Sequence, residues 1–460
     1  MKFFIVCPGG LEGVLQQELE LIAKRPEVKN LGSIQVDPIP ANLTGGISVD
    51  GPIALAMAIN LHSRVASRVL LKLAKDTYQT EDDLYRMAKR LGWEDWFQIN
   101  QTLRVDITAQ RSPLKSLNFA TLKVKDAIVD RLREKTGERP NIDTVNPDIR
   151  VQVHLTNQYA TIYLDTSGEA LFKRGWREEK GEAPLKENLA AGILMLTNWQ
   201  VDEPLYDPMC GSGTFLIEAA QTALRIPPGA LRAKILDPLE QQKNQVWKSH
   251  VIDTGFGFMR LKPFQTNLEK KNWQALCEVA KQEMKQHITQ PLQISGSDIQ
   301  EKMVAICKSN WQRARLPGLP VVRQVDAIQI KPPANYQNNQ RGIMIFNPPY
   351  GERISIKGGD QDRLVPFNQS NSSYVQKRRT SREPLVKEPI DSKFATLLDQ
   401  FSKQLKDYFG GWEVFVLTAD MGFPGHLRMK ESKRTPLFNG PLECRLFKFE
   451  IRRKEVSERS

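Results

Sequence analysis

The sequence has few of the residues that mark several common kinds of site. It contains only 5 cysteines in 460 residues and no CxxC pair, which argues against a disulfide framework or a zinc site and favours a reducing compartment. The 5 histidines are scattered without an HExxH motif, and no carboxylate pair suited to metal or glycosidic chemistry stands out. We therefore expect no metal site.

Long apolar runs are also missing. No run of 18 apolar residues occurs, and the apolar start before Pro8 is too short for a secretory signal, so we expect a cytoplasmic protein with no membrane partner. Positive charge is abundant instead: 65 Lys and Arg against 53 Asp and Glu give a net charge of +12. Such an excess attracts polyanions, and nucleic acid is the leading candidate. The length predicts two or three domains.

The first 170 residues have the pattern of two small α+β units. Residues 1–60 combine short strands with an amphipathic helix at GLEGVLQQELELI. Residues 61–170 alternate strands with the helices TEDDLYRMAKRLGW and NFATLKVKDAIVDRLREK, of which the second is rich in cations. A cationic run of this kind is also typical of a solvated helix face, and that interpretation stays open.

A second cationic stretch, FKRGWREEKG, surrounds Trp176. Cations beside an aromatic ring can hold phosphates while the ring stacks on a base, a common way of binding single-stranded nucleic acid. The candidate RNA-binding residues of the two stretches are Lys115, Lys123, Lys125, Arg131, Lys173, Arg174, Trp176 and Arg177.

Residues 183–452 alternate apolar strands and helices, the pattern of a doubly wound parallel sheet. In LYDPMCGSGTFLIEAAQTAL a strand ends at Asp207, and Gly211 and Gly213 form a turn before a helix. Glycines let the backbone approach a ligand, and a helix start offers free N–H groups. Phe215 stands where a dinucleotide fingerprint would have its third glycine, so a pyrophosphate cofactor is disfavoured.

Two further acids follow expected strands of this region. Asp298 precedes a helix, where a carboxylate can accept hydrogen bonds from ribose hydroxyls, although SDIQ also suits a helix N-cap. Asp326 stands near the end of PVVRQVDAIQI, where it could accept from an adenine amine or be an exposed loop residue. Both pairs of alternatives stay open.

The stretch NPPYGER, residues 347–353, directly follows the apolar run GIMIF. Pro348 and Pro349 remove N–H donors and fix φ, so they end the strand in a stiff turn that presents groups to a ligand. The Asn347 side-chain oxygen and the Pro348 carbonyl can accept the hydrogens of a nucleobase amine, and Tyr350 can stack on the base. The matching electrophile is a sulfonium methyl, which needs alignment more than a base or a metal.

DPMCGSGTFLIEAA followed by NPPYGER resembles the class I methyltransferases that use S-adenosylmethionine to modify exocyclic amines. CPGGLEGVLQQEL, FKRGWR with APLKENLAAGIL, and PLFNGPLECRLFKFEI extend the resemblance to the THUMP-domain RNA methyltransferases, most closely the large-subunit ribosomal RNA guanine-N2 methyltransferases. The resemblance implies a ferredoxin-like unit (1–60), a THUMP RNA-binding domain (61–170) and a Rossmann-like α/β methyltransferase domain (183–452), with S-adenosyl-L-methionine as cofactor.

The resemblance also implies residue roles. The methionine part of the cofactor would contact Asp207, Pro208, Gly211 and Gly213, its ribose Asp298 and its adenine Asp326, while the target base would contact Asn347, Pro348, Pro349 and Tyr350.

Residues 354–391 look like an insertion rich in Ser, Asn and Arg, which could clamp RNA or decorate the surface. The sequence ends without the second methyltransferase domain of some longer relatives, so we expect a single modification.

Three functions are compatible with these residues. The favoured one is guanine-N2 methylation of large-subunit (23S-type) ribosomal RNA, free or in a precursor particle. Adenine-N6 methylation of DNA or RNA is the second, because the same tetrapeptide serves both amines; the extended N-terminal region, which shows no helix-turn-helix pattern, favours RNA. The third is a non-catalytic RNA-binding assembly factor, which would be expected to lose Asn347 or the glycines.

Overall fold

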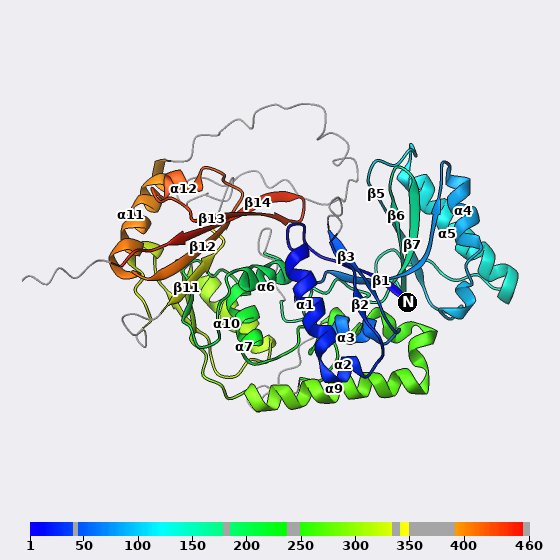
Figure 1. Ribbon diagram of the computed structural model, residues 1–460, viewed down its shortest axis with the longest axis horizontal. Helices are drawn as coiled ribbons and strands as arrows, with labels where there is room; N and C mark the ends of the chain where they lie inside the picture. Colours follow the sequence, from blue (N-terminus) through cyan, green and yellow to red (C-terminus); the bar gives the residue numbers. More distant parts are fainter. Residues whose placement is uncertain (40–44, 178–184, 237–248, 334–340, 349–391, 454–460) are drawn as a thin grey trace, which may run out of the picture.

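The computed structural model contains two seven-stranded sheets, one on each side of the view in Figure 1. It describes residues 1–39, 45–177, 185–236, 249–333, 341–348 and 392–453. Among these residues, no helix is long and apolar enough to cross a bilayer, and no three His, Cys, Asp or Glu side chains are grouped so that they could hold a metal ion. The predicted insertion 354–391 lies outside the described residues.

The first sheet has the strand order β2-β3-β1-β4-β7-β6-β5. Only β5 and β6 pair parallel; the other neighbours are antiparallel. β4 pairs with β1 on one side and with β7 on the other, so the two expected N-terminal units share one continuous sheet. Its strands are β1 (Lys2–Val6), β2 (Gln35–Val36), β3 (Gly46–Asp50), β4 (Arg68–Thr77), β5 (Leu103–Ala109), β6 (Ile149–Leu155) and β7 (Tyr159–Asp165).

Local signals explain where the helices of this half begin. The Thr80 and Asp83 pair forms a capping box at the start of α4, in which the Thr80 N–H donates to Asp83 Oδ2 at 2.8 Å. Ser116 caps α5, and Gly137, with φ +80°, ends it. The helices are α1 (Glu12–Lys24), α2 (Pro26–Lys29), α3 (Leu55–His62), α4 (Glu81–Lys89) and α5 (Leu117–Thr136), with a 3₁₀ turn η1 (Trp93–Asp95).

The second sheet has the order β10-β9-β8-β11-β12-β14-β13. The first five of these strands run parallel, while β14 is antiparallel to β12 and β13 to β14. The expected doubly wound α/β sheet is confirmed, with an antiparallel hairpin at one edge. Its strands are β8 (Leu205–Asp207), β9 (Ile294–Asp298), β10 (Val321–Gln324), β11 (Gly342–Phe346), β12 (Trp412–Thr418), β13 (Lys433–Asn439) and β14 (Leu442–Glu450).

A segment expected within the catalytic half also supports the first sheet. The Phe258 N–H donates to the Thr166 carbonyl (2.7 Å) and the Lys262 N–H to the Trp96 carbonyl (2.8 Å), and α9 runs beneath α2 and α3 (Figure 1). The helices of this half are α6 (Glu187–Leu196), α7 (Thr214–Ala223), α8 (His250–Thr254), α9 (Asn267–His287), α10 (Glu301–Arg313), α11 (Ser392–Tyr408) and α12 (Phe423–His426). Its 3₁₀ turns are η3 (Gly257–Arg260), η4 (Lys262–Gln265) and η5 (Ala327–Gln329).

The two halves also meet directly. Gly10 has φ +90°, and a Cβ there would lie 2.3 Å from the Pro436 carbonyl oxygen of β13, so the PGG turn of the N-terminus needs glycine at this point. In the segment that joins the halves, Arg174 Nε donates to Glu218 Oε1 of α7 at 3.1 Å, and these two side chains are 1% and 0% exposed. The halves are therefore held by close backbone packing at Gly10, and a buried ion pair fixes the segment between them.

We expect Glu218→Gln to lower the free energy of unfolding by about 3 kcal/mol, because it leaves the buried Arg174 charge without its partner. The matched control is Glu134→Gln, because Glu134 is 57% exposed and pairs with Lys89 at the surface. Such exposed pairs contribute little to stability. Urea unfolding followed by fluorescence measures both variants, and equal midpoints would contradict the prediction.

Candidate active site

Four of the predicted site residues lie at the carboxyl ends of four neighbouring strands. Asp207 ends β8, Asp298 ends β9, Asp326 follows β10 by two residues and Asn347 directly follows β11. The parallel registers bring these ends to one edge of the sheet. The chain reverses its direction of winding between β8 and β11, and in open α/β sheets that is where ligands bind.

The turn after β8 has a backbone that favours glycine. Gly211 has φ +51° and Gly213 has φ +84°. A Cβ on Gly213 would lie 2.4 Å from Cys307 Sγ of α10, whereas the nearest atom to a Cβ on Gly211 is Met303 Cε at 3.8 Å. Gly213 is thus required for packing against α10, while Gly211 leaves the turn open to a ligand. Pro208 precedes this turn, and its carbonyl accepts the Ser297 hydroxyl at 3.3 Å.

Asp207 and Asp298 are carboxyl groups in surroundings that disfavour their charge. Burial raises the pKa of Asp207 well above its usual value, and the neighbouring Asp298 raises it further; one bond from the Met209 N–H (3.0 Å) opposes this. Burial also raises the pKa of Asp298, although the N–H groups of Gly211 (3.0 Å) and Gln300 (2.9 Å) donate to it. A ligand that brings donors or positive charge would stabilise both carboxylates.

The structure excludes one alternative for Asp298 and adds a capping role for Asp326. Asp298 is not the N-cap of α10, because that helix begins at Glu301 with Gln300 as its cap. Asp326 is partly exposed and caps the short turn η5, with its Oδ1 accepting the Ile328 N–H at 3.1 Å. A capping role therefore explains one oxygen of Asp326 without any ligand.

Asn347 carries an unpaired polar atom. Its Oδ1 is buried and has no hydrogen-bond partner in the part of the chain that the structure describes. Leaving a buried acceptor unpaired costs about 1–3 kcal/mol, so this oxygen is suited to a donor from a ligand. Pro348 beside it is buried. Pro349 and Tyr350, predicted for the same site, lie outside the described residues.

Two residues that the sequence analysis did not assign to this site hold the glycine-rich turn. Asn310 Nδ2 of α10 donates to the Ser212 carbonyl at 3.0 Å, and Arg177 donates to Thr214 Oγ1 at 2.7 Å. Arg177 was expected to bind RNA. Both lie far from the turn in sequence, so no spacing or motif could have placed them here.

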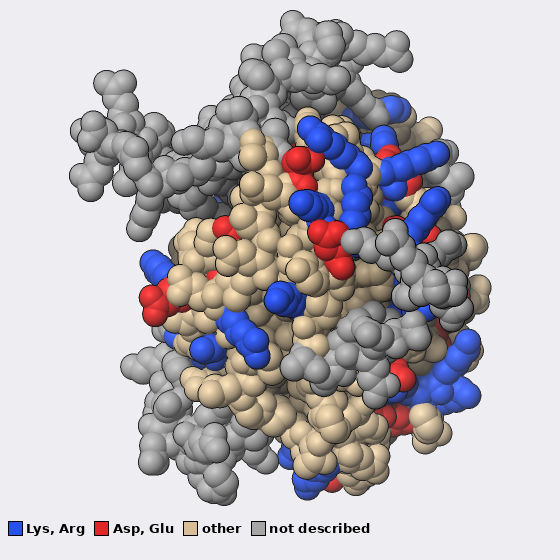
Figure 2. All heavy atoms as spheres, turned by 90° about the vertical axis from the view of Figure 1, so that its left-hand side faces the viewer, with Lys and Arg blue, Asp and Glu red and all other residues tan. Residues whose placement is uncertain are grey.

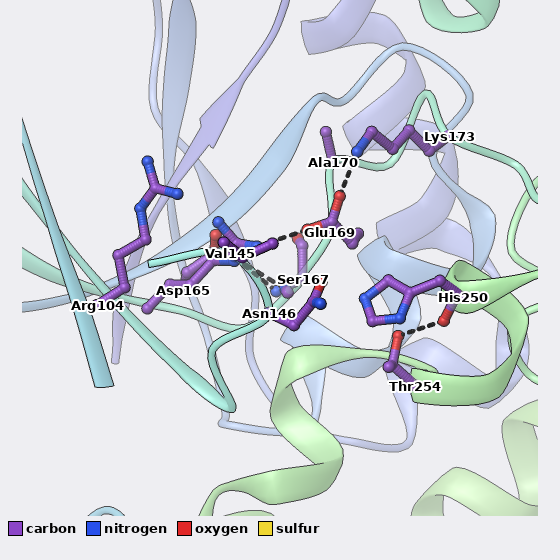
Figure 3. Close-up of polar contacts among 12 residues, drawn as sticks. Arg104, Val145, Asn146, Asp165, Ser167, Glu169, Ala170, Lys173, His250 and Thr254 are labelled. Carbon is purple, nitrogen blue, oxygen red and sulfur yellow. Dashed lines mark hydrogen bonds and ion pairs between the residues drawn. The ribbon is translucent and has the colours of Figure 1, made fainter. Parts of the chain in front are cut away.

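Burial rules out direct RNA contact for two of the predicted RNA-binding residues. Trp176 is 0% exposed and Arg174 is 2% exposed, so neither a base nor a phosphate can reach them. The charged composition of FKRGWR suggested an exposed surface. The residue that allows Arg174 to be buried is Glu218, which lies far along the chain and could not be paired with it from the sequence. Lys173 is exposed and points back to Glu169, with which it forms an ion pair (Figure 3).

The predicted RNA-binding cations of α5 are all paired with carboxylates. The pairs are Lys123 with Asp82 (2.8 Å), Lys125 with Asp126 (2.9 Å) and Arg131 with Glu94 (2.5 Å). Lys115, just before α5, is exposed and has no ion pair with any residue that the structure describes. At the opposite end of the molecule, Figure 2 likewise shows blue and red side chains intermixed.

Three family models match the chain in the order that the fold shows. They are the RlmL ferredoxin-like domain (residues 2–70), the THUMP domain (78–165) and the RMKL-like methyltransferase domain (174–375). A Synechocystis relative, provisionally named as an RNA methyltransferase, is 32% identical over 98% of this chain and 96% of its own length. The chain belongs to the THUMP-domain class I methyltransferases.

Other members and neighbours of this family match as well. A Psychromonas ingrahamii protein named ribosomal RNA large subunit methyltransferase K/L is 33% identical over 98% of this chain and 50% of its own. The THUMP-domain methyltransferase described here thus spans about half the length of the K/L relatives. The crystal structure of SMU.472, provisionally assigned as a methyltransferase and complexed with SAH, matches with a TM-score of 0.69, 25% identity and 99% of both chains.

A further solved structure comes from Listeria monocytogenes. That protein is described by prediction as an N6-adenine-specific DNA methylase and matches with a TM-score of 0.69 and 25% identity over 98% of this chain and 96% of its own. The relatives of this THUMP-domain methyltransferase therefore carry different substrate descriptions, ribosomal RNA for the K/L proteins and adenine in DNA for the Listeria protein.

We expect Gly213→Ala to destabilise the protein by about 2 kcal/mol or more, because the added Cβ meets Cys307 Sγ and the backbone has a positive φ. Gly211→Ala is the matched control, with the backbone cost alone, on the order of 1 kcal/mol. Thermal melting compares them. Cys307→Ala should recover part of the Gly213→Ala loss but none of the Gly211→Ala loss, and equal effects of both glycine variants would contradict the packing argument.

Proposed function

We propose that this protein transfers the methyl group of S-adenosyl-L-methionine to the exocyclic N2 amine of a guanine in large-subunit ribosomal RNA. The observation that carries the proposal is the buried Oδ1 of Asn347, which has no hydrogen-bond partner among the described residues and lies at the end of β11 beside the glycine-rich turn that follows β8. The names of the K/L relatives support the substrate class, and the THUMP match supports RNA.

The residues at the strand ends fit this cofactor. It supplies a methyl group on a positively charged sulfur, together with an amino group and ribose hydroxyls as donors. Asp207 and Asp298 need such groups, because burial disfavours their ionised forms. Gly211 leaves room for close approach of a ligand. Asp326 uses only Oδ1 for its described capping bond, so its second oxygen can accept from an adenine amine.

The turn after β11 would position the base. Asn347 Oδ1 and the Pro348 carbonyl accept the two N2 hydrogens, which directs the nitrogen lone pair toward the methyl carbon. Tyr350 stacks on the base and Pro349 stiffens the turn in this proposal. Alignment of this kind can contribute roughly 7–11 kcal/mol. A guanine in stacked RNA must first leave its helix, at a cost of a few kcal/mol.

Adenine-N6 methylation is the second candidate. The description of the Listeria neighbour favours it, and two acceptors at the strand end serve either amine. The net charge of +12 suits either nucleic acid, and the THUMP match favours RNA over DNA. A non-catalytic role is disfavoured, because Asn347 and both glycines are present. A ribosomal RNA substrate, free or in a precursor particle, implies a cytoplasmic protein.

We expect Asn347→Ala to lower the turnover of ribosomal RNA methylation by about 10²-fold or more, because it removes a preorganised acceptor at the reacting amine. The affinities for SAH and for RNA should change little. Single-turnover kinetics with mass-spectrometric mapping of the product measures the rate and the methylated base. Turnover within a few-fold of wild type would contradict the role of Asn347, and a methylated adenine would select the second candidate.

The ion pairs of α5 lead to a sharper prediction for RNA binding. Lys115→Gln should make the plot of log affinity against log salt less steep by about 0.7. Each phosphate contact releases counterions from the RNA, so removing one contact removes that contribution to the salt dependence. Arg131→Gln should change the slope less, since Glu94 already neutralises Arg131. Titrations between about 50 and 200 mM salt test both. An unchanged slope for Lys115→Gln would place the RNA-binding surface elsewhere.

A further inference from the structure

Residues 171–177, here called the strap, are bonded to both halves of the molecule. Arg174 donates to the Arg64 carbonyl (2.6 Å), in the loop before β4, and to Glu218 of α7 (3.1 Å). Arg64 in turn donates to the carbonyls of Gln221 (3.1 Å) and Ile226 (2.6 Å), at the far end of α7. The middle of the strap is therefore fixed to the loop before β4 of the first sheet and to the helix that starts at the glycine-rich turn.

Arg177 is the last residue of the strap and reaches that turn. Its two terminal nitrogens donate to Thr214 Oγ1 (2.7 Å), the Leu185 carbonyl (3.1 Å) and Ser212 Oγ (3.4 Å). Its Nε donates to Glu187 Oε1 at 2.9 Å. Ser212 stands between the two glycines, and Thr214 is the first residue of α7. One guanidinium thus joins the strap, the start of α6 and the turn.

The surroundings of Arg177 hold it in this geometry. Its guanidinium lies 5.1 Å from the centroid of the buried Trp176 ring, and its side chain is 11% exposed. Glu187 is buried at the start of α6, and Arg177 favours its charged form against the burial that raises its pKa. A planar fork with several donors suits four such contacts, which a lysine cannot make.

The glycine-rich turn needs this support because glycine contributes no rigidity of its own. Gly211 and Gly213 have positive φ, and a glycine can adopt many other backbone conformations. Any population of the turn in a conformation that cannot bind the cofactor reduces the apparent affinity. Asn310 of α10 holds the Ser212 carbonyl, and Arg177 holds the Ser212 and Thr214 hydroxyls. The turn is therefore fastened by side chains from two different elements.

We propose that Arg177 is a positioning residue for the cofactor, which holds Ser212 and Thr214 so that the glycine-rich turn keeps its binding conformation. This inference rests on the proposed function, because it takes the turn as the cofactor site. It assigns Arg177 to the cofactor rather than to RNA. If the competent population of the turn falls to about a tenth without Arg177, the Kd for the cofactor rises about 10-fold.

The test compares full-length wild type with Arg177→Gln, Arg177→Lys and Lys173→Gln. Lys173→Gln is the matched control, because Lys173 belongs to the same strap but is exposed and pairs with Glu169, away from the glycine-rich turn (Figure 3). For each protein, the Kd for SAH is measured by calorimetry, the affinity for RNA by titration and the stability by thermal melting. We expect the Kd for SAH to rise about 10-fold or more in Arg177→Gln and less in Arg177→Lys, with RNA affinity unchanged. Lys173→Gln should leave the Kd for SAH unchanged.

A second variant keeps the test decisive if Arg177→Gln melts at a much lower temperature. Thr214→Val removes one partner of Arg177 without leaving an unpaired charge, and it should also raise the Kd for SAH. Normal SAH affinity in Thr214→Val and Arg177→Gln would overturn the inference while leaving the proposed function intact. Loss of RNA affinity with normal SAH affinity would overturn it as well. Failure of the wild type to bind SAH would instead contradict the proposed function.

Discussion

Parallel pairing of β8, β9, β10 and β11 is the constraint on which the site depends. Groups that follow parallel strands emerge at one edge of a sheet, so Asp207, Asp298 and Asn347 become neighbours although they are far apart in sequence. All five residues of β11 are buried, as a central strand covered on both faces requires. Phe346 packs edge-on against Phe401 of α11 with ring centroids 5.5 Å apart. This packing fixes the point at which the chain turns at Asn347.

The glycine-rich turn shows how openness and rigidity are supplied by different residues. Positive φ at Gly211 and Gly213 lets the backbone turn tightly and leaves space for a ligand above Gly211. Rigidity comes from outside the turn, through the packing of Gly213 on Cys307 and through the side chains of Asn310 and Arg177. Because Arg177 and Arg174 belong to one short strap, the glycine-rich turn and the N-terminal sheet are supported by the same segment.

Charge composition and the placement of individual charges have different meanings in this protein. The excess of Lys and Arg over Asp and Glu indicates a polyanionic partner, and membership of the THUMP-domain methyltransferases agrees with that indication. Many cations nevertheless have structural partners: Arg174 is buried against Glu218, and Arg131 is paired with Glu94. A cation contributes its full charge to phosphate binding only where its charged group is exposed to solvent and has no carboxylate partner. Net charge alone therefore indicates the kind of partner but does not locate the surface that binds it.

The sequence by itself determined the α+β class of the first half, the α/β class of the second half and the residues at the strand ends. These features depend on local patterns: the capping box of α4, the apolar run of β11, and the glycines and prolines that end strands. Only the tertiary structure decided that β4 joins two units into one sheet, that α9 supports that sheet, and that Trp176 and Arg174 are buried. The physical reason is that burial and pairing depend on partners distant in the chain. The spacing of charges around Trp176 describes only its neighbours in sequence. The positions of Arg174 and Arg177 are instead set by their hydrogen bonds to Glu218 and Thr214, which are distant in the chain.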